Sequence, residues 1–146
     1  EGGFSALLPA KPAKEVRRAQ IGAWTLILTM LSVQLDTLAY GIGYADLPDA
    51  LTAADREVLI RAARDQLAAN VKASASRERS VSLANATGIA FAADGATIDG
   101  PALTLVARVY VSDRRFYQLV VAGTRERVAR SDAELFLDSF KLLSAP

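Results

Sequence analysis

The chain contains neither histidine nor cysteine. Without histidine it lacks the side chain whose unperturbed pKa lies nearest neutral pH, and the commonest imidazole ligand of metals. Without cysteine it has no disulfide, no thiolate nucleophile and no thiolate zinc site. We therefore predict no metal and no cofactor. The compartment stays open, because lack of cysteine is compatible with both the cytosol and the periplasm.

An excess of charge of either sign is also missing. The chain has 17 Lys and Arg residues against 16 Asp and Glu residues, which leaves a formal net charge of +1. Such a chain has no long-range field that would attract nucleic acid or an acidic membrane surface. We expect no nucleic-acid partner.

No hydrophobic run is long enough to span a bilayer. The longest candidate, residues 21–35, is shorter than the roughly 20 residues of a spanning helix and contains Thr25, Thr29, Ser32 and Gln34. We interpret it as strand structure that is buried on at least one face. The chain starts at Glu1 without a methionine, which suggests that a signal peptide or membrane anchor was removed, or that the sequence given simply begins there.

Regular alternation of apolar residues is present instead, and the length of 146 residues favours one domain over residues 1–146. Period-two patterns predict strands over residues 4–8, 15–20, 24–35 and 38–44, with a turn near Gly22. Thr52 and Asp55 form a weak capping box that opens a helix to about residue 73. We expect its buried stripe to consist of Val58, Leu59, Ala62, Ala63, Leu67 and Val71.

The second half of the chain shows similar signals. Residues 73–80 lose the stripe and are predicted to be a frayed end or loop, and residues 81–91 resume alternation. Residues 103–111 and 115–122 predict a hairpin, followed by a helix that Ser131 and Glu134 cap. We expect Ala133, Phe136, Leu137, Phe140 and Leu143 to be buried. The order predicts an α+β fold: a largely antiparallel sheet of about six to seven strands flanked by helices, an α/β/α sandwich.

Four stretches resemble the PsbP-like fold family, which includes the PsbP extrinsic proteins of photosystem II, a Ran-binding nuclear-import factor and many bacterial exported domains. They are FSALLPAKP at 4–12, YADLP at 44–48, VYV at 109–111 with FYQL at 116–119, and FLDSF at 136–140. The resemblance implies the sandwich fold, an accessory or binding role, and a periplasmic or membrane-anchored location outside the cytoplasm. Family members that are linked to manganese and calcium use histidines in part. This chain has none, and nothing in it matches a specific Ran-binding surface.

Two groups of side chains are candidates for a binding site. The first is a basic cluster in the C-terminal hairpin and the loop after it, which we interpret as a surface for a protein partner in the cell envelope: Arg114, Arg115, Arg125, Arg127 and Arg130. Its alternative is solvated turn charge. The second is an aromatic set that could line a pocket for a small apolar or amphipathic ligand: Trp24, Tyr40, Tyr44, Tyr110 and Tyr117. Its alternative is core packing with hydroxyls at the rim.

A catalytic reading has little support. The chain contains no G-x-S-x-G elbow and no Ser-x-x-Lys motif. Asp46 with Asp49, and Asp94 with Asp99, lack the spacing of a calcium loop and fit turn chemistry. We expect a non-catalytic accessory or interaction domain, with a small-ligand carrier as the alternative and an enzyme third.

Overall fold

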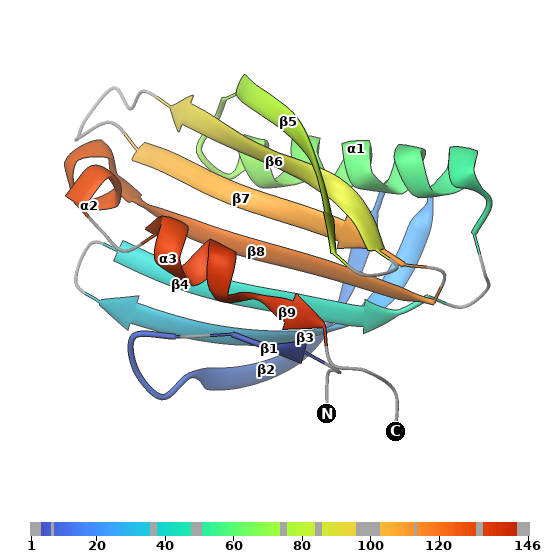
Figure 1. Ribbon diagram of the computed structural model, residues 1–146, viewed down its shortest axis with the longest axis horizontal. Helices are drawn as coiled ribbons and strands as arrows, with labels where there is room; N and C mark the ends of the chain where they lie inside the picture. Colours follow the sequence, from blue (N-terminus) through green and yellow to red (C-terminus); the bar gives the residue numbers. More distant parts are fainter. Residues whose placement is uncertain are drawn as a thin grey trace.

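The computed structural model describes residues 4–6, 8–35, 38–47, 51–73, 76–83, 86–95, 103–112, 114–130 and 133–142, except for the side chain of Arg130. They form an antiparallel sheet in the strand order β2-β3-β4-β8-β7-β6-β5, with helices on both faces (Figure 1). The predicted α+β fold class is confirmed. A separate two-stranded sheet pairs β1 with β9.

The elements follow one another along the chain as strands, helix, strands and helices. They are β1 (Phe4–Ser5), β2 (Ala13–Ile21), β3 (Trp24–Leu35), β4 (Leu38–Asp46), α1 (Ala53–Ala69), β5 (Ser76–Leu83), β6 (Ala86–Gly95), β7 (Leu103–Val111), β8 (Arg115–Thr124), α2 (Arg125–Arg130), α3 (Ala133–Ser139) and β9 (Lys141–Leu142).

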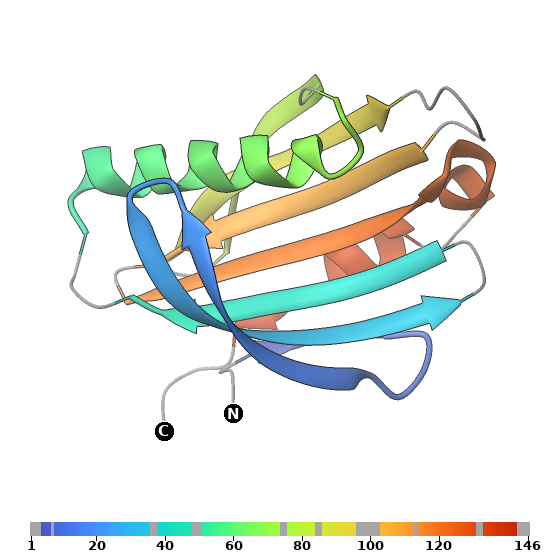
Figure 2. The same cartoon turned by 180° about the vertical axis from the view of Figure 1, so that it is seen from behind.

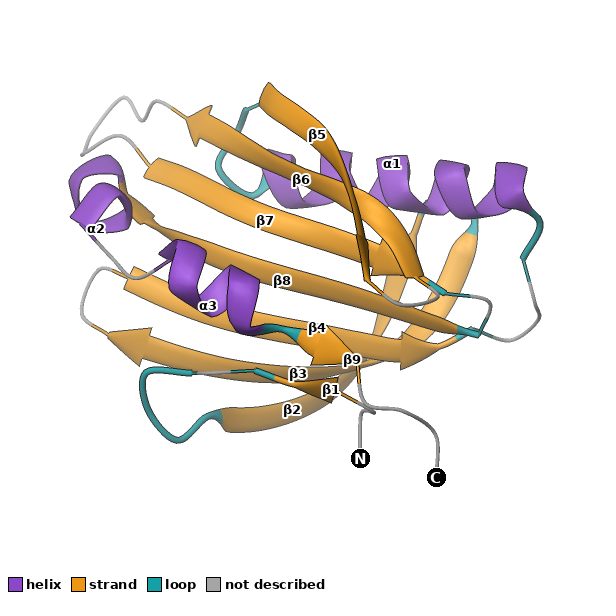
Figure 3. Ribbon diagram, in the orientation of Figure 1, coloured by secondary structure: helices purple, strands orange, loops and turns teal. Residues whose placement is uncertain are grey.

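The two faces of the large sheet carry separate cores, because successive side chains of a strand point to opposite faces. On the α1 face, seen in Figure 2, α1 packs on residues such as Leu28, Leu105 and Phe116. The opposite face, which we call the α3 face, is covered by α2, α3, β1 and β9 (Figure 3). Its core includes Tyr110 and Phe140.

Helix α1 begins as predicted but is rotated relative to the predicted stripe. The Thr52 hydroxyl accepts a hydrogen bond from the Asp55 backbone N–H at 3.1 Å, which confirms the cap. Val58 was expected to be buried and is 54% exposed, whereas Ile60 is buried. Residues 60 and 64 share one side of the helix, and Arg64 of that side forms an ion pair with Glu78 of β5 at 2.7 Å. Ile60 therefore lies on the side of α1 that faces β5, and it is buried there.

The predicted loop over residues 73–80 is wrong for its second half, because β5 starts at Ser76 and pairs with β6. The alternation over residues 81–91 also belongs to two strands, with Leu83 opposite Ala86. As an edge strand, β5 exposes the charged Arg77, Glu78 and Arg79. Charges along an edge discourage pairing with other chains and remove the apolar alternation by which a strand is recognised.

The C-terminal hairpin and the burial along the last helix are confirmed where the chain is described, but the helix ends at Ser139, and Lys141–Leu142 form β9 where the helix was expected to continue. β7 and β8 form the predicted hairpin, and Ala133, Phe136, Leu137 and Phe140 are buried. Ser131 of the expected cap and Leu143 lie outside the described residues, as does Asp113 of the expected turn. The short helix α2 and the pairing of β1 with β9 were not predicted.

The edges of the sheet curl toward opposite faces. The β2–β3 turn reaches α1 (Figure 2), where Gly22 adopts φ +60° and a β-carbon would lie 3.0 Å from that of Ala62. The predicted turn near Gly22 is thus confirmed. At the other edge, β5 crosses in front of β6 on the α3 face (Figure 1). This curl gives the α3 face a raised rim opposite α2 and α3.

Candidate binding groove

A groove of about 750 Å3, which we call the α3 groove, lies on the α3 face. Strands β6 and β7 supply its floor, α2 and α3 one wall, and the start of β5 the other rim. The apolar residues that line it are Val106, Val128, Ala129, Ala133 and Leu135, and the polar ones are Arg77, Asp94, Thr104, Arg125 and Glu134. The groove therefore combines an apolar surface with charges of both signs.

Arg108 holds the α3 wall in place. Its side chain is only 8% exposed, and its Nη2 donates hydrogen bonds to Asp138 at 2.7 Å and Glu134 at 3.1 Å. The two carboxylates are four residues apart and share one side of the helix. Burial alone would lower the pKa of Arg108, but the hydrogen bond to Asp138 and the interactions with Tyr110 outweigh burial and raise the pKa. Arg108 thus remains charged and ties α3 to β7.

The opposite rim is built around Asp94 of β6. Its Oδ1 accepts a hydrogen bond from the Thr104 hydroxyl at 2.8 Å, and its Oδ2 lies 3.4 Å from Nη1 of Arg77. Arg77 adopts φ +52° where the β5–β6 register shifts between Ser76 and Arg79. A non-glycine residue in this region costs free energy and persists only where its surroundings hold it. Arg77 lines the groove at this irregularity of β5.

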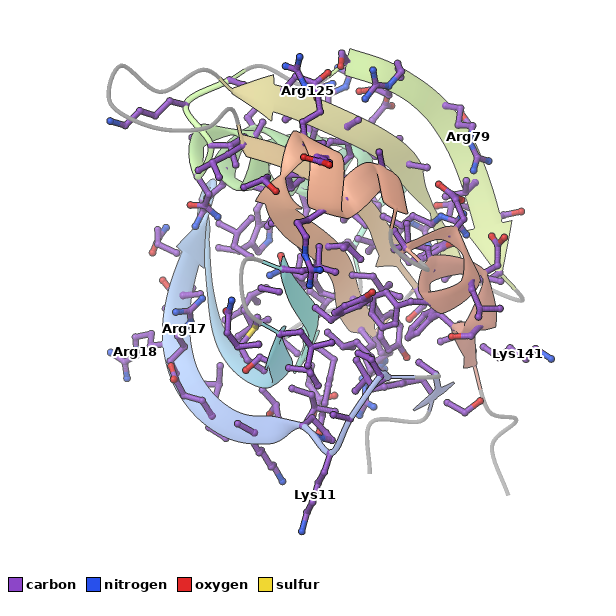
Figure 4. All side chains as sticks on the ribbon, turned by 90° about the vertical axis from the view of Figure 1, so that its left-hand side faces the viewer. Lys11, Arg17, Arg18, Arg79, Arg125 and Lys141 are labelled. Carbon is purple, nitrogen blue, oxygen red and sulfur yellow. The ribbon has the colours of Figure 1, made fainter. Side chains whose placement is uncertain are left out.

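Arg125 differs from the other charged residues of the groove. It opens α2 directly after β8 and is exposed. Within the part of the chain that the structure describes, it has no ion-pair partner. The labelled cations in Figure 4 point in different directions, with Arg17 and Arg18 on one side of the molecule and Arg79 on the other. Arg125 thus belongs to the groove and not to a general basic face.

The structure does not bring the five predicted arginines together. Arg114 and Arg115 lie at the start of β8 and α2 lies beyond its end (Figure 1), so the ten residues of β8 separate them by roughly 30 Å. Arg115 forms an ion pair with Asp46 at 2.7 Å. Arg127 donates a hydrogen bond to the Leu35 carbonyl at 3.4 Å and does not line the groove. The backbone of Arg130 ends α2. Of the four whose side chains the structure describes, Arg125 alone lines the α3 groove.

The five predicted aromatic residues are divided between the two faces. Trp24 packs against the core of the α1 face, whereas Tyr40, Tyr44, Tyr110 and Tyr117 lie on the α3 face. Tyr44, Tyr117 and Tyr110 are neighbours in register across β4, β8 and β7.

Phenylalanine rings cover the tyrosines. Phe140 lies with its ring centroid 5.7 Å from that of Tyr110 and 5.5 Å from that of Tyr117. Phe136 contacts Tyr40 edge-on, with the ring centroids 5.3 Å apart. A ligand on this side of the sheet would have to displace these rings.

The burial of Tyr117 makes stability depend on pH in the alkaline range. Burial raises the pKa of its phenol, and the Arg115 guanidinium offsets part of the rise. The unfolded chain loses this proton near pH 10, so the stability supplied by the neutral ring is present below about pH 10 and is lost as the pH rises above it. Phenylalanine has no proton to lose, so the unfolding free energy of Tyr117→Phe should not show this loss. We expect the difference between the unfolding free energies of Tyr117→Phe and the wild type, measured by urea titration, to increase in favour of the variant from about pH 8 to about pH 11. An unchanged difference would mean that Tyr117 titrates as it does in the unfolded chain.

Sequence reasoning missed Arg108, Leu135 and Arg77. A signal for Arg108 exists in the sequence, because it is a charge inside an apolar strand and Glu134 and Asp138 follow at helical spacing. Arg77 carries no such signal, since its role depends on a bulge. Leu135 lies outside the predicted buried face and is 60% exposed, but exposure alone did not mark it as part of a groove.

No family model matches the chain, and no curated protein matches it. Among the described residues, no helix combines the length and the apolar character that crossing a membrane requires. The α3 groove can bind through charge and apolar contact.

Proposed function

We propose that this domain is a non-catalytic interaction module that binds a partner protein through the α3 groove. The observation that carries the proposal is the meeting of Arg125 with the exposed Leu135 in one concave surface. Interfaces commonly combine an apolar centre with charged residues at the rim. An exposed leucine alone would need no explanation, but here it borders a groove that also holds Arg125.

The rigidity of the groove supports the same proposal. Arg108 fixes α3 to β7, and Thr104 fixes Asp94 on the opposite rim. A surface that is already ordered loses less conformational entropy when it binds. These contacts at the wall and at the rim would lower the entropic cost of docking.

A small amphipathic ligand is the second candidate. The groove volume of about 750 Å3 falls in the range of roughly 300–1,000 Å3 that small-molecule sites occupy. The binding site proposed for such a ligand is the α3 groove and not the tyrosines, because the tyrosines pack against phenylalanine rings.

The cellular setting rests on the resemblance to the PsbP-like family alone. That resemblance supports an accessory role and a location outside the cytoplasm, where the partner would be an envelope protein. Membership of the family and export both stay predictions.

Charge reversal on α2 tests the proposed site. We expect Arg125→Glu to weaken capture of the partner about tenfold or more, measured by cross-linking of the tagged full-length protein in its native cell and quantitative mass spectrometry. Arg127→Glu is the matched control, because it makes the same charge change two residues away, outside the groove. Equal capture by both variants would remove the groove from consideration.

A further inference from the structure

We infer that the α3 groove recognises an extended segment of its partner in which aliphatic residues are flanked on both sides by acidic residues. This inference rests on the proposed function and adds the chemistry of the partner. Two observations support the inference. Among the described residues, the carboxylates of the groove form ion pairs whereas two cations do not, and a second hollow continues the groove along α3.

The carboxylates that the structure describes on this surface, Asp94, Glu134 and Asp138, are already paired. Asp94 is bound by Thr104 and Arg77, and Arg108 binds both Glu134 and Asp138. A cationic segment would have to compete with these contacts. Among the residues that the structure describes, an acidic segment meets no unpaired carboxylate on this surface.

Two cations remain at the ends of the surface. Arg125 lies at one end of the α3 groove. Lys141 lines a second hollow, of about 410 Å3, on the far side of Leu135. Within the described ranges neither cation has an ion-pair partner, so both are available to carboxylates of a ligand. Figure 4 shows them on well-separated parts of the surface.

Leu135 lies between these cations and borders both hollows. The α3 groove adds Val106 and Ala129 to the apolar surface, and the second hollow adds Ala6. A small molecule would fill only one hollow. An extended chain can run through both, with aliphatic side chains against Leu135 and acidic side chains at Arg125 and Lys141.

Selection from a random peptide library, displayed on phage, tests the inference with the intact domain as bait. We expect enriched peptides to carry leucine, isoleucine or valine between acidic residues. Their affinity, measured by fluorescence anisotropy, is expected to fall about tenfold or more with Arg125→Glu, with Lys141→Glu and with Leu135→Ala. The matched controls are expected to change affinity less than about twofold: Arg127→Glu, Lys11→Glu and Val58→Ala. All six positions are exposed, and equal melting temperatures would show that each variant is folded.

The other outcomes separate this inference from the proposed function. Enriched peptides without acidic residues, whose binding still depends on Leu135, would overturn the acidic motif and leave the groove as the interaction site. Peptides that bind equally well to Leu135→Ala, or a failure to enrich any peptide, would overturn the inference. If capture of the native partner were also insensitive to Arg125→Glu, the proposed function would fall as well.

Discussion

Replacing Phe140 by alanine is expected to lower the free energy of unfolding by about 3–5 kcal/mol. Phe140 is 1% exposed, and its ring contacts Phe4, Tyr110 and Tyr117 at centroid distances of 5.3 to 5.7 Å. Tyr110 and Tyr117 belong to the central strands β7 and β8, so the large sheet would border the cavity left by the ring. Such a site collapses poorly, which places the loss in the upper part of the usual range for core deletions.

Urea titration of the purified domain measures this loss directly. Leu135→Ala is the control, because it shortens an exposed side chain of α3, the helix that Phe140 directly follows, and should change stability by less than about 0.5 kcal/mol. A loss below roughly 1 kcal/mol for Phe140→Ala would contradict the packing of the chain end on the α3 face. Since Phe140 directly follows α3, the same substitution should also loosen the wall of the α3 groove.

Replacing Gly88 by alanine is expected to cost more than about 3 kcal/mol, at or beyond the upper end of ordinary overpacking. A β-carbon at Gly88 would overlap the Val109 carbonyl oxygen and would lie 2.9 Å from the Cα of Tyr110. Both obstacles are backbone atoms of β7, and no change of rotamer can relieve them. The β6–β7 ladder itself would have to shift.

Gly41→Ala provides the control for this prediction. Gly41 is also buried in a central strand, but the nearest atom to an added β-carbon is the Leu31 carbonyl oxygen at 3.9 Å, an ordinary contact. We expect thermal melts to show a large loss for Gly88→Ala and a change within about 1 kcal/mol for Gly41→Ala. Similar melting temperatures for the two variants would contradict the close approach of β6 and β7.

The fold could be predicted where an element buries one face. The alternation in β4 and β7, Phe136 of α3 and Phe140 just after it reflect burial, and their predictions are confirmed. The first part of β5, residues 76–80, and the helix α2 were missed because their residues are polar on most sides. The predicted burial of Val58 was wrong because the apolar stripe alone does not fix how α1 is rotated about its axis. The contact between α1 and β5, seen in the Arg64–Glu78 ion pair, is not visible in the sequence.

The candidate site was less predictable because neighbours in sequence need not be neighbours in space. Arg115 and Arg125 are ten residues apart, and a strand between them turns that separation into roughly 30 Å. A helix over the same residues would have spanned about half that distance. In contrast, Arg77 and Arg125 lie 48 positions apart in the chain and line one groove, which only the pairing of β5, β6 and β7 reveals.

The most direct test of the central claim compares partner capture by Arg125→Glu and Arg127→Glu in the native cell. Both variants should accumulate to the same level, because each replaces an exposed residue of α2. Our account predicts that a reproducible partner is recovered with Arg127→Glu as with the wild type and is depleted about tenfold or more with Arg125→Glu. Recovery of the same partner in equal amounts with both variants would contradict binding through the α3 groove.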